Sequence, residues 1–423
     1  MLCETDNDTD DAKKPSLSIA YLSPAWPAHA FYNGIATGID TLAPALRTRG
    51  HRVTIIANQV AEGMSDRSVY DLAHRKPRNA AQDVLIQIGY RLAPKRTHAY
   101  LTRHAILAAI KRARVEQGIQ ILEMEESFGW ARSICQNASI PVCIRLHGPW
   151  FLNGPAQGCL QDDTFRRRVF DEGQAIRAAH AVSAVSSDVL QRVREFYGIA
   201  LPDAQVIPGT TPAVPAGDRW QLEDAEPKTV LFVGRFDRHK GGDLVVEAFA
   251  HVLREIPDAR LWMVGPDSGF VASDGRKWKI EEFICDRLPG ALETARIRWF
   301  GFQTMSELNR LRRKAMVTVV CSRYETFSSA TLEAMTMGCP TVAAKVGGIV
   351  EILQDQHTGL FHRSEDPADL AAKILTLLTD PVRAAQVGRR AADNCEQRFH
   401  PHVIAPRFAD YFDQVIRRWT RVT

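Results

Sequence analysis

The sequence predicts an α/β protein made of two Rossmann-like domains, each a doubly wound parallel sheet, which face one another across a cleft. Three observations support this fold class. At 423 residues the chain is too long for one ordinary domain. Short apolar runs rich in β-forming residues alternate with helical patterns along its whole length. A stretch rich in proline and glycine at residues 208–217 divides it into two halves of similar size.

The first domain is predicted at residues 16–208, after an acidic and polar segment, residues 1–15, that we expect to be disordered. Its strands are the short apolar runs, and a helical pattern at residues 34–50 ends in Gly50, a residue type that terminates helices. The predicted strands are residues 17–22, 53–57, 120–123, 142–146, 181–185 and 205–207.

The second domain is predicted at residues 228–398, beyond a linker at residues 209–227. It contains a helix at residues 244–256, and a further helical pattern follows at residues 399–419. Ligands of open α/β sheets bind beyond the carboxyl ends of the strands, so the cleft between the domains is the expected site. The predicted strands are residues 229–233, 261–264, 297–300 and 316–321.

Bulk composition limits the class of partner. Apolar residues make up 45% and charged residues 24% of the chain, as in ordinary globular proteins. The formal net charge of +4 is too small for a chain-wide nucleic-acid surface, so we expect no nucleic-acid partner. The eight cysteines form no C-x-x-C pair, which favours reduced thiols. No signal region or membrane-spanning run is visible, so we expect a cytoplasmic protein.

A basic, glycine-rich turn at residues 233–242 follows a predicted strand and opens a helix. Gly234 lets the backbone approach a ligand closely, Arg235 can bind a phosphate group through two hydrogen bonds, and Lys240 adds a point charge. The helix N-terminus adds its own positive field. This turn predicts a clamp for a diphosphate, and a solvated basic loop is the alternative.

Two glutamates, Glu325 and Glu333, bracket the turn after the predicted strand at residues 316–321. Carboxylates at the mouth of an α/β site are strong acceptors for sugar and ribose hydroxyls, whereas an ordinary amphipathic helix with a capping acid is the alternative. A hydrolytic pair would need carboxyl groups roughly 5 to 9.5 Å apart. Eight residues of one helix span about 12 Å. The phosphate-binding turn upstream therefore favours transfer from an activated donor.

Taken in order, these motifs resemble the nucleotide-sugar domain of retaining family-4 glycosyltransferases of the GT-B fold. The resemblance rests on GR-x4-KGG at residues 234–242, on Gly265 in VG-x-D, on the E-x7-E pair and on the two glycines at residues 347–348. It is close over residues 229–360 and looser elsewhere. It makes residues 228–398 the donor-binding domain and residues 16–208 the acceptor-side domain, to which the helix at residues 399–419 would return.

The resemblance also implies roles for individual residues. Arg235 and Lys240 would hold the donor diphosphate, and Phe302 would meet the base through its backbone. Glu325, with the backbone amides of residues 326–329, would bind the donor sugar, and Glu333 the ribose. The family is generally metal-independent, so we expect no metal and no cofactor beyond a UDP- or GDP-sugar as substrate. The donor-binding residues implied are Asn33, Gly34, Gly234, Arg235, Lys240, Gly265, Phe302, Glu325, Thr326, Phe327, Ser328, Ser329 and Glu333.

Two positions depart from the family's pattern. After Phe327 the family often has glycine, whereas this chain has Ser328, which leaves the identity of the sugar open. Near the start of the chain the family usually has two glycines before Ile35. Here the first is Asn33, which can also take a left-handed backbone, while Gly34 stays available for close approach.

His147 follows the predicted strand at residues 142–146 and matches a histidine that in this family usually faces the reacting sugar. A structural histidine at a strand end is the alternative, but its place at a carboxyl strand end favours function. With Arg235, Lys240 and Glu325 it forms the catalytic set that we expect.

Residues 74–114 form an unusually basic segment, with ten lysines and arginines against one acid, Asp83. Apolar residues are interleaved with the charges. The pattern is typical of a surface for an anionic membrane, a lipid diphosphate or an anionic sugar polymer. It is equally typical of packed helices with a solvated basic face. The membrane interpretation would place the protein on the inner face of the membrane.

The reaction that we expect is transfer of a hexosyl unit from a nucleoside-diphosphate sugar to a hydroxyl acceptor, either a lipid-linked or an anionic glycan, with retained anomeric configuration. Two alternatives with the same fold are a nucleotide-sugar epimerase and a sugar phosphorylase. An alternative of another class is a membrane-associated protein that senses nucleotide sugars without turning them over.

Overall fold

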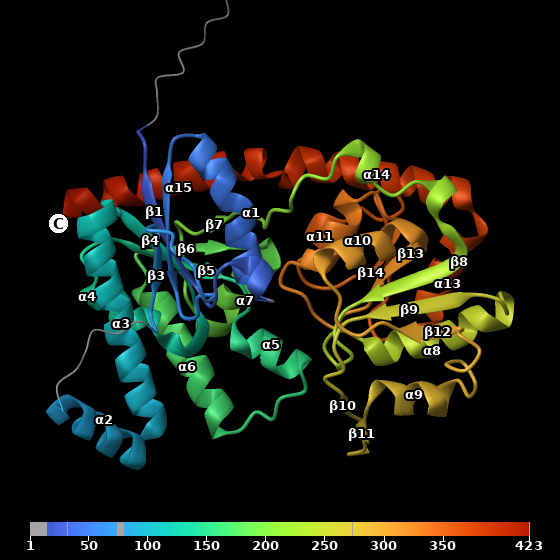
Figure 1. Ribbon diagram of the computed structural model, residues 1–423, viewed down its shortest axis with the longest axis horizontal. Coiled ribbons are helices and arrows are strands. Elements are labelled where there is room, and N and C mark those ends of the chain that lie inside the picture. The colour runs from blue at the N-terminus through green and yellow to red at the C-terminus, as the bar shows by residue number, and fades with distance from the viewer. Residues whose placement is uncertain (1–14, 32, 74–79, 273, 423) are drawn as a thin grey trace, which may run out of the picture.

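The structure is a computed structural model that describes residues 15–31, 33–73, 80–272 and 274–422. The predictions for residues 1–14 and for residues 74–79 of the basic segment lie outside the described residues. Two parallel sheets, each flanked by helices, stand side by side in the described chain (Figure 1). The predicted fold class is confirmed.

The first sheet has seven strands in the order β3-β2-β1-β4-β5-β6-β7, all paired in parallel. The strand order reverses between β1 and β4. All six strands predicted for this half are present, and the structure adds β3, a short strand at the sheet edge. The strands are β1 Ser18–Ser23, β2 Arg52–Ala57, β3 Val69–Asp71, β4 Ile121–Glu125, β5 Val142–Leu146, β6 Ala181–Ala184 and β7 Gln205–Val206.

Helices cover both faces of the first sheet. α1 packs with β1, β2 and the last helix of the chain on one face, and α3, α4 and α6 lie with the apolar cluster on the other. The helices are α1 Gly34–Thr48, α2 Ala80–Leu92, α3 Pro94–Gln117, α4 Ala131–Asn137, α5 Trp150–Ala156, α6 Asp163–Ala178 and α7 Ser187–Tyr197, with short 3-10 turns at Ala28–Ala30 and Ser127–Gly129.

The second sheet has six strands in the order β12-β9-β8-β13-β14-β15, again all parallel. The four predicted strands are present. The strands are β8 Glu226–Val233, β9 Arg260–Val264, β12 Ile297–Trp299, β13 Ala315–Val320, β14 Thr341–Ala344 and β15 Leu360–His362, beside an antiparallel ribbon of β10 Phe270–Val271 and β11 Lys277–Trp278.

Helices also flank the second sheet, and two 3-10 turns, Ala216–Asp218 and Leu222–Asp224, precede it. The helices are α8 Gly242–Glu255, α9 Ile280–Arg287, α10 Met305–Lys314, α11 Ser329–Thr336, α12 Ile349–Ile352, α13 Pro367–Thr379 and α14 Pro381–Phe399.

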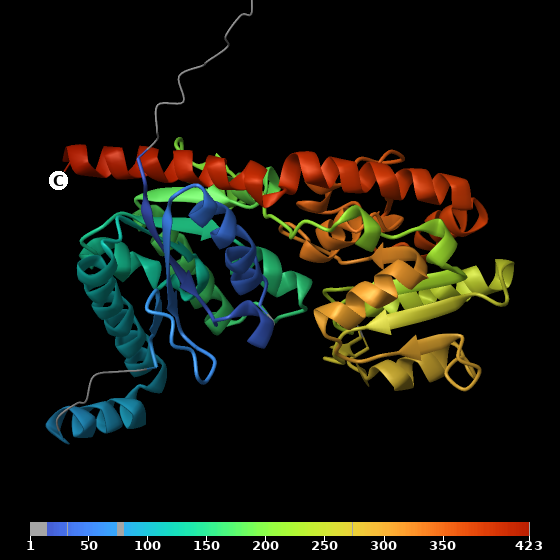
Figure 2. The same ribbon diagram turned by 45° about the horizontal axis from the view of Figure 1, so that its top comes forward.

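The end of the chain joins the two halves. α14 contacts α11 and α13 of the second half, whereas α15, Pro401–Val422, packs on α1 of the first. Figure 2 shows the two helices, in red, running along both halves. Ile404, Phe408 and Phe412 of α15 are buried in one apolar cluster with Ile19 and Tyr21 of β1. No helix in the described part of the chain is long and apolar enough to cross a bilayer.

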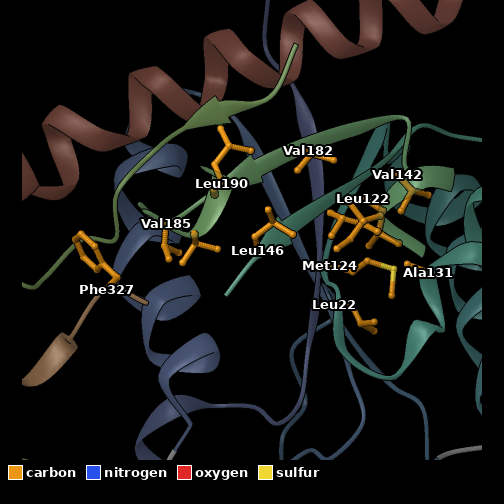
Figure 3. Close-up of a cluster of buried hydrophobic side chains, with 14 of the residues drawn as sticks. Leu22, Leu122, Met124, Ala131, Val142, Leu146, Val182, Val185, Leu190 and Phe327 are labelled. Carbon is orange, nitrogen blue, oxygen red and sulfur yellow. The ribbon is translucent and has the colours of Figure 1, made fainter. Parts of the chain in front are cut away.

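One buried cluster contains residues of both halves. Leu146 of β5 and Val185, the residue after β6, lie in it with Phe327 from the second half (Figure 3). The Phe327 ring also contacts Phe399, with ring centroids 5.9 Å apart. This packing anchors the loop between β13 and α11 at the junction of the two halves.

Candidate active site

A cavity of about 540 Å³ lies between the two halves at the carboxyl ends of the central strands. Most of the site residues predicted from the sequence line it. Those in the lining are Asn33, Gly34, His147, Lys240, Glu325, Thr326, Phe327, Ser328, Ser329 and Glu333.

Glu325 and Lys240 form an ion pair in this cavity. The Lys240 ammonium nitrogen lies 2.6 Å from Glu325 Oε1, and the Ser322 hydroxyl donates to the same oxygen at 2.7 Å. Glu325 is buried, which by itself would raise the pKa of its carboxyl, but the charge of Lys240 and then that of His239 outweigh burial and lower the pKa below its usual value. The carboxylate is therefore ionised and fixed as a hydrogen-bond acceptor.

Two glycines let the loop take this shape. The Gly348 backbone N–H donates to the Glu325 carbonyl at 2.8 Å. A side chain on Gly347, which has a φ of +45°, would meet that carbonyl oxygen at 2.1 Å, and one on Gly348 would meet the Thr326 oxygen at the same distance. Any other residue at these positions would displace the backbone that carries Glu325.

Glu333 is held by a residue that the sequence did not single out. Arg312 of α10 is fully buried, with 1% of its side chain exposed, and its Nη2 donates to Glu333 Oε2 at 2.6 Å. Its Nη1 donates to Asn309 at 3.1 Å. The Glu333 carboxylate therefore keeps its position at the cavity wall on the second turn of α11.

Ser328 adopts a backbone that favours glycine, with a φ of +27°. Its hydroxyl caps α11 by accepting hydrogen bonds from the backbone N–H and the hydroxyl of Thr331, at 3.3 and 2.9 Å. Thr326, two residues earlier, donates from its hydroxyl to the His147 carbonyl at 2.6 Å, so the loop is tied to the first half.

His147 lies half-buried at the carboxyl end of β5. Burial, followed by the nearby Arg145 guanidinium, lowers its pKa to about 3, so its ring is neutral at physiological pH. Glu126, also missed from the sequence, accepts hydrogen bonds from the backbone N–H groups of His147 at 3.0 Å and of Gly148 at 2.7 Å. Glu126 follows β4, and an acid just beyond a strand end was the signal that could have identified it.

Asn33 differs from expectation. Its backbone is extended, with a φ of −145°, rather than left-handed. The reason is that its side-chain oxygen caps α1, accepting from the N–H groups of Ile35 and Ala36 at 2.9 and 3.2 Å. Gly34 faces open space, with no atom within 4 Å of a side chain built there.

Four predicted residues lie away from the cavity lining. Arg235 is exposed and pairs with Asp237 at 2.7 Å. Gly234 and Gly265 pack against each other, because a side chain on Gly265 would meet the Gly234 oxygen at 2.1 Å. Phe302 follows β12 and is 47% exposed. Within residues 15–31, 33–73, 80–272 and 274–422, no group of three His, Cys, Asp or Glu side chains is arranged to hold a metal ion.

Known proteins resemble this chain in both sequence and fold. The glycosyl transferases group 1 family matches residues 218–394, and glycosyltransferase family 4 matches residues 32–210. A D-inositol 3-phosphate glycosyltransferase of Nocardiopsis dassonvillei is 30% identical over 234 residues, and the match spans about half of each protein, 54%. A glycogen synthase of Mycobacterium tuberculosis is 22% identical over 401 residues, 90% of each.

Solved structures share the fold along almost the whole chain. Sucrose-phosphate synthase from Thermosynechococcus elongatus superposes with a TM-score of 0.69 at 21% identity, covering 95% of this chain and all of that one. HepE of Anabaena, in complex with UDP and glucose, gives 0.65 at 18% identity, covering 94% and 100%. The two family models together cover most of the sequence, and the chain therefore belongs to the group 1 glycosyltransferases of family 4, with their GT-B fold.

Proposed function

We propose that the protein transfers a hexosyl unit from a UDP- or GDP-sugar to a hydroxyl acceptor with retained anomeric configuration and without a metal ion. The observation that carries this proposal is the Lys240–Glu325 pair in the cavity between the domains. An ammonium group there can stabilise the negative charge that develops on a leaving diphosphate, while the neighbouring carboxylate accepts hydrogen bonds from the donor sugar.

The other residues around the pair fit the same donor. The residues that follow Thr326 line the cavity at the N-terminus of α11, and a helix N-terminus favours anionic groups. Glu333, positioned by Arg312, is a charged acceptor for two ribose hydroxyls. Arg235 is exposed and can exchange Asp237 for a phosphate oxygen at little cost, since exposed ion pairs are weak. His147 is neutral and faces the cavity as a hydrogen-bonding group.

The named relatives support a choice of first donor but not of acceptor. HepE was solved with UDP and glucose, so UDP-glucose is the donor to test first. The names of the related inositol-phosphate transferase and glycogen synthase point to different acceptors, so these relatives do not identify the acceptor of this chain. We propose a glycan or lipid-linked glycan.

A screen of UDP-, GDP- and ADP-sugars by thermal shift and by hydrolysis tests the donor assignment. At least one nucleotide sugar should raise the melting temperature and be hydrolysed slowly, and nuclear magnetic resonance of early product should show the donor's anomeric configuration.

Lys240→Met should lower turnover by about 10² to 10³. Lys228→Met, which removes an ammonium group paired with Asp258 on the surface, is the matched control. Failure of every nucleotide sugar to bind would refute the assignment.

We also propose that α2 and α3 bind the inner, anionic face of a membrane. α2 projects from the first domain (Figures 1 and 2) and exposes large apolar side chains, including Ile88 and Leu92, the latter 81% exposed. Arg91 and Arg96 are exposed beside them. Apolar side chains flanked by cations are what an anionic bilayer surface attracts.

Sedimentation with vesicles tests this surface. Phosphatidylcholine vesicles that contain phosphatidylglycerol should retain the protein, and pure phosphatidylcholine vesicles should not. The double variant Ile88→Glu/Leu92→Glu should stay in solution, whereas Val382→Glu, at an exposed apolar site on α14, should bind as before. Equal binding of both variants would contradict the proposal.

A further inference from the structure

Lys240 and Glu325 meet in the cavity from two different segments of the chain. Lys240 belongs to the turn between β8 and α8, residues 234–241, and Glu325 to the loop between β13 and α11. A lysine side chain is long and flexible, so the place of its ammonium group depends on how firmly the backbone below it is held. The geometry of the pair therefore depends on the contacts that fix this turn against the loop.

The guanidinium group of Arg323, in the loop, binds the turn on both sides of Lys240. The Arg323 side chain is largely buried, with 11% of it exposed, and its Nη1 and Nη2 donate to the two carboxylate oxygens of Asp243 at 2.9 and 2.8 Å. Nη1 also donates to the Arg238 carbonyl, and Nε donates to Glu365 at 2.7 Å. Arg238 precedes Lys240 and Asp243 follows it, so one side chain spans the residues that carry the ammonium group.

Backbone contacts join the same two segments. The Arg323 N–H donates to the His239 carbonyl at 2.9 Å, and the His239 ring donates from Nε2 to the Tyr324 carbonyl at 2.7 Å. A side chain on Gly241, which has a φ of +73°, would meet the Cys321 carbonyl oxygen at 2.2 Å, so the turn lies directly against the loop. The turn and the loop are thereby attached immediately beside the ion pair.

Arg323 makes these contacts from outside the cavity. Neither Arg323 nor Asp243 belongs to the cavity lining, whereas Lys240 and Glu325 do. The charge of Arg323 is matched by Asp243, which is 12% exposed, and by Glu365. A two-bond pair between a guanidinium and a carboxylate fixes distance and orientation together. Any effect of Arg323 on a bound donor therefore passes through the backbone that carries Lys240.

We infer that Arg323 is a positioning residue for the proposed transfer, and that its contacts with Asp243 and Arg238 place the Lys240 ammonium group where the leaving diphosphate becomes charged. The inference rests on the proposed function and adds to it a residue that touches no substrate. A misplacement of about 1 Å can lower the rate of an enzyme about 10²-fold. Lysine cannot replace Arg323, because one ammonium nitrogen cannot reproduce the planar fork that binds both Asp243 oxygens and the Arg238 carbonyl.

Arg323→Lys tests the inference, because it keeps the positive charge and removes the fork. With UDP-glucose, or the donor that the screen identifies, kcat for transfer or hydrolysis should fall about 10- to 100-fold. The affinity for the free nucleoside of that donor should stay the same, because Glu333 is held by Arg312 and not by this turn. Asp243→Asn, which keeps one oxygen for Arg323, should lower kcat about 3- to 10-fold and is the second variant if Arg323→Lys does not fold.

A double variant separates positioning from damage to the fold. Lys240→Met alone is expected to lower turnover by about 10² to 10³. If Arg323 acts through Lys240, the double variant Arg323→Lys/Lys240→Met should match the turnover of Lys240→Met to within about threefold. Two independent losses would instead multiply to about 10³ to 10⁵.

Arg219 offers a matched control. It is also largely buried, with 21% of its side chain exposed, and it donates to the Val214 carbonyl at 3.1 Å and to Glu396 at 2.8 Å. It does not line the cavity. Arg219→Lys should therefore leave kcat unchanged, whatever its effect on the melting temperature.

Unchanged kcat in both Arg323→Lys and Asp243→Asn would overturn the positioning role, and so would a double variant whose loss is the product of the two single losses. A parallel loss of nucleoside affinity in Arg323→Lys, as expected from a general loosening of the domain, would also contradict it. The transferase assignment would stand in all three cases. Absence of nucleotide-sugar binding and hydrolysis in the unaltered protein would instead overturn the proposed function, and the positioning role with it.

Discussion

Replacing Glu333 with alanine should reduce the stability of the protein, because this carboxylate is the partner of a buried arginine. It should also reduce the affinity for nucleotide, because the same carboxylate is the proposed acceptor for the ribose hydroxyls. Arg312 is 1% exposed, and its Nη2 lies 2.6 Å from Glu333 Oε2. Removing one member of a buried ion pair leaves the other charge uncompensated, which costs roughly 3–5 kcal/mol. Asn309 remains as a second acceptor, so we expect the lower end of this range.

A loss of about 3 kcal/mol corresponds to a fall in melting temperature of roughly 6 to 12 °C for a domain of this size. The double variant Arg312→Met/Glu333→Ala removes the unpaired charge and should recover most of that loss. Glu333→Gln keeps an oxygen for Arg312 but loses the charge on the ribose acceptor. Its affinity for UDP should therefore fall about tenfold or more with a smaller effect on stability.

Calorimetric unfolding of the three variants and titration with UDP measure both effects. The reasoning fails if Glu333→Ala melts with the unaltered protein, or if the double variant is no more stable than the single one. Unchanged UDP affinity in Glu333→Gln would remove the ribose role while leaving the ion pair intact.

Arg235→Ala should lower kcat about 10²-fold, with almost no change in melting temperature because its pair with Asp237 is exposed; unchanged kcat would refute its phosphate role. His147 has a pKa of about 3, so it should not titrate near pH 6.5. The pH profiles of kcat/KM for the unaltered protein and for His147→Gln should therefore have the same shape around pH 6.5. Burial, followed by the charges of Glu172 and Glu125, raises the pKa of Glu126 from 4.5 to about 8. Between these two pH values the carboxyl is ionised in the unfolded chain but protonated in the folded protein, so the free energy of unfolding falls progressively as pH rises from about 4.5 to about 8. Urea unfolding at both ends of this window should show a smaller difference in Glu126→Gln. Ser328→Gly should keep the melting temperature, because glycine relieves the positive φ while losing only the cap, and should alter the preference among donor sugars in competition assays.

The sequence was sufficient to predict those features that depend on residues close together along the chain. Strands followed by glycine-rich turns are local patterns, which is why the two parallel sheets and the turns around Lys240 and Glu325 could be predicted. β14, with the sequence TVAA, is fully buried but was not predicted, because four residues with two alanines give too weak a strand pattern. β3, three residues long at the sheet edge, carries even less signal.

Features that depend on contacts between distant residues could not be predicted. Lys240 and Glu325 are 85 residues apart, and no local pattern shows that one neutralises the other. Likewise, an arginine at the end of an amphipathic helix is usually solvated, so Arg312 carried no sign of its complete burial. The capping role of Asn33 depended on where α1 begins, and element boundaries are what periodicity locates least well.

The loop that carries Glu325 also connects the two domains, through the residues on either side of Glu325. Tyr324 donates from its hydroxyl to Asp188 of α7 at 2.9 Å, and Thr326 donates to the His147 carbonyl at 2.6 Å. Both acceptors belong to the first domain, whereas Glu325 between them faces the cavity from the second. In the proposed function, a donor sugar bound to Glu325 would contact a residue whose two neighbours make contacts between the domains. Under this proposal, sugar recognition would share one segment of backbone with the contacts that join the domains, so a change in one would reach the other through adjacent peptide bonds rather than across the protein.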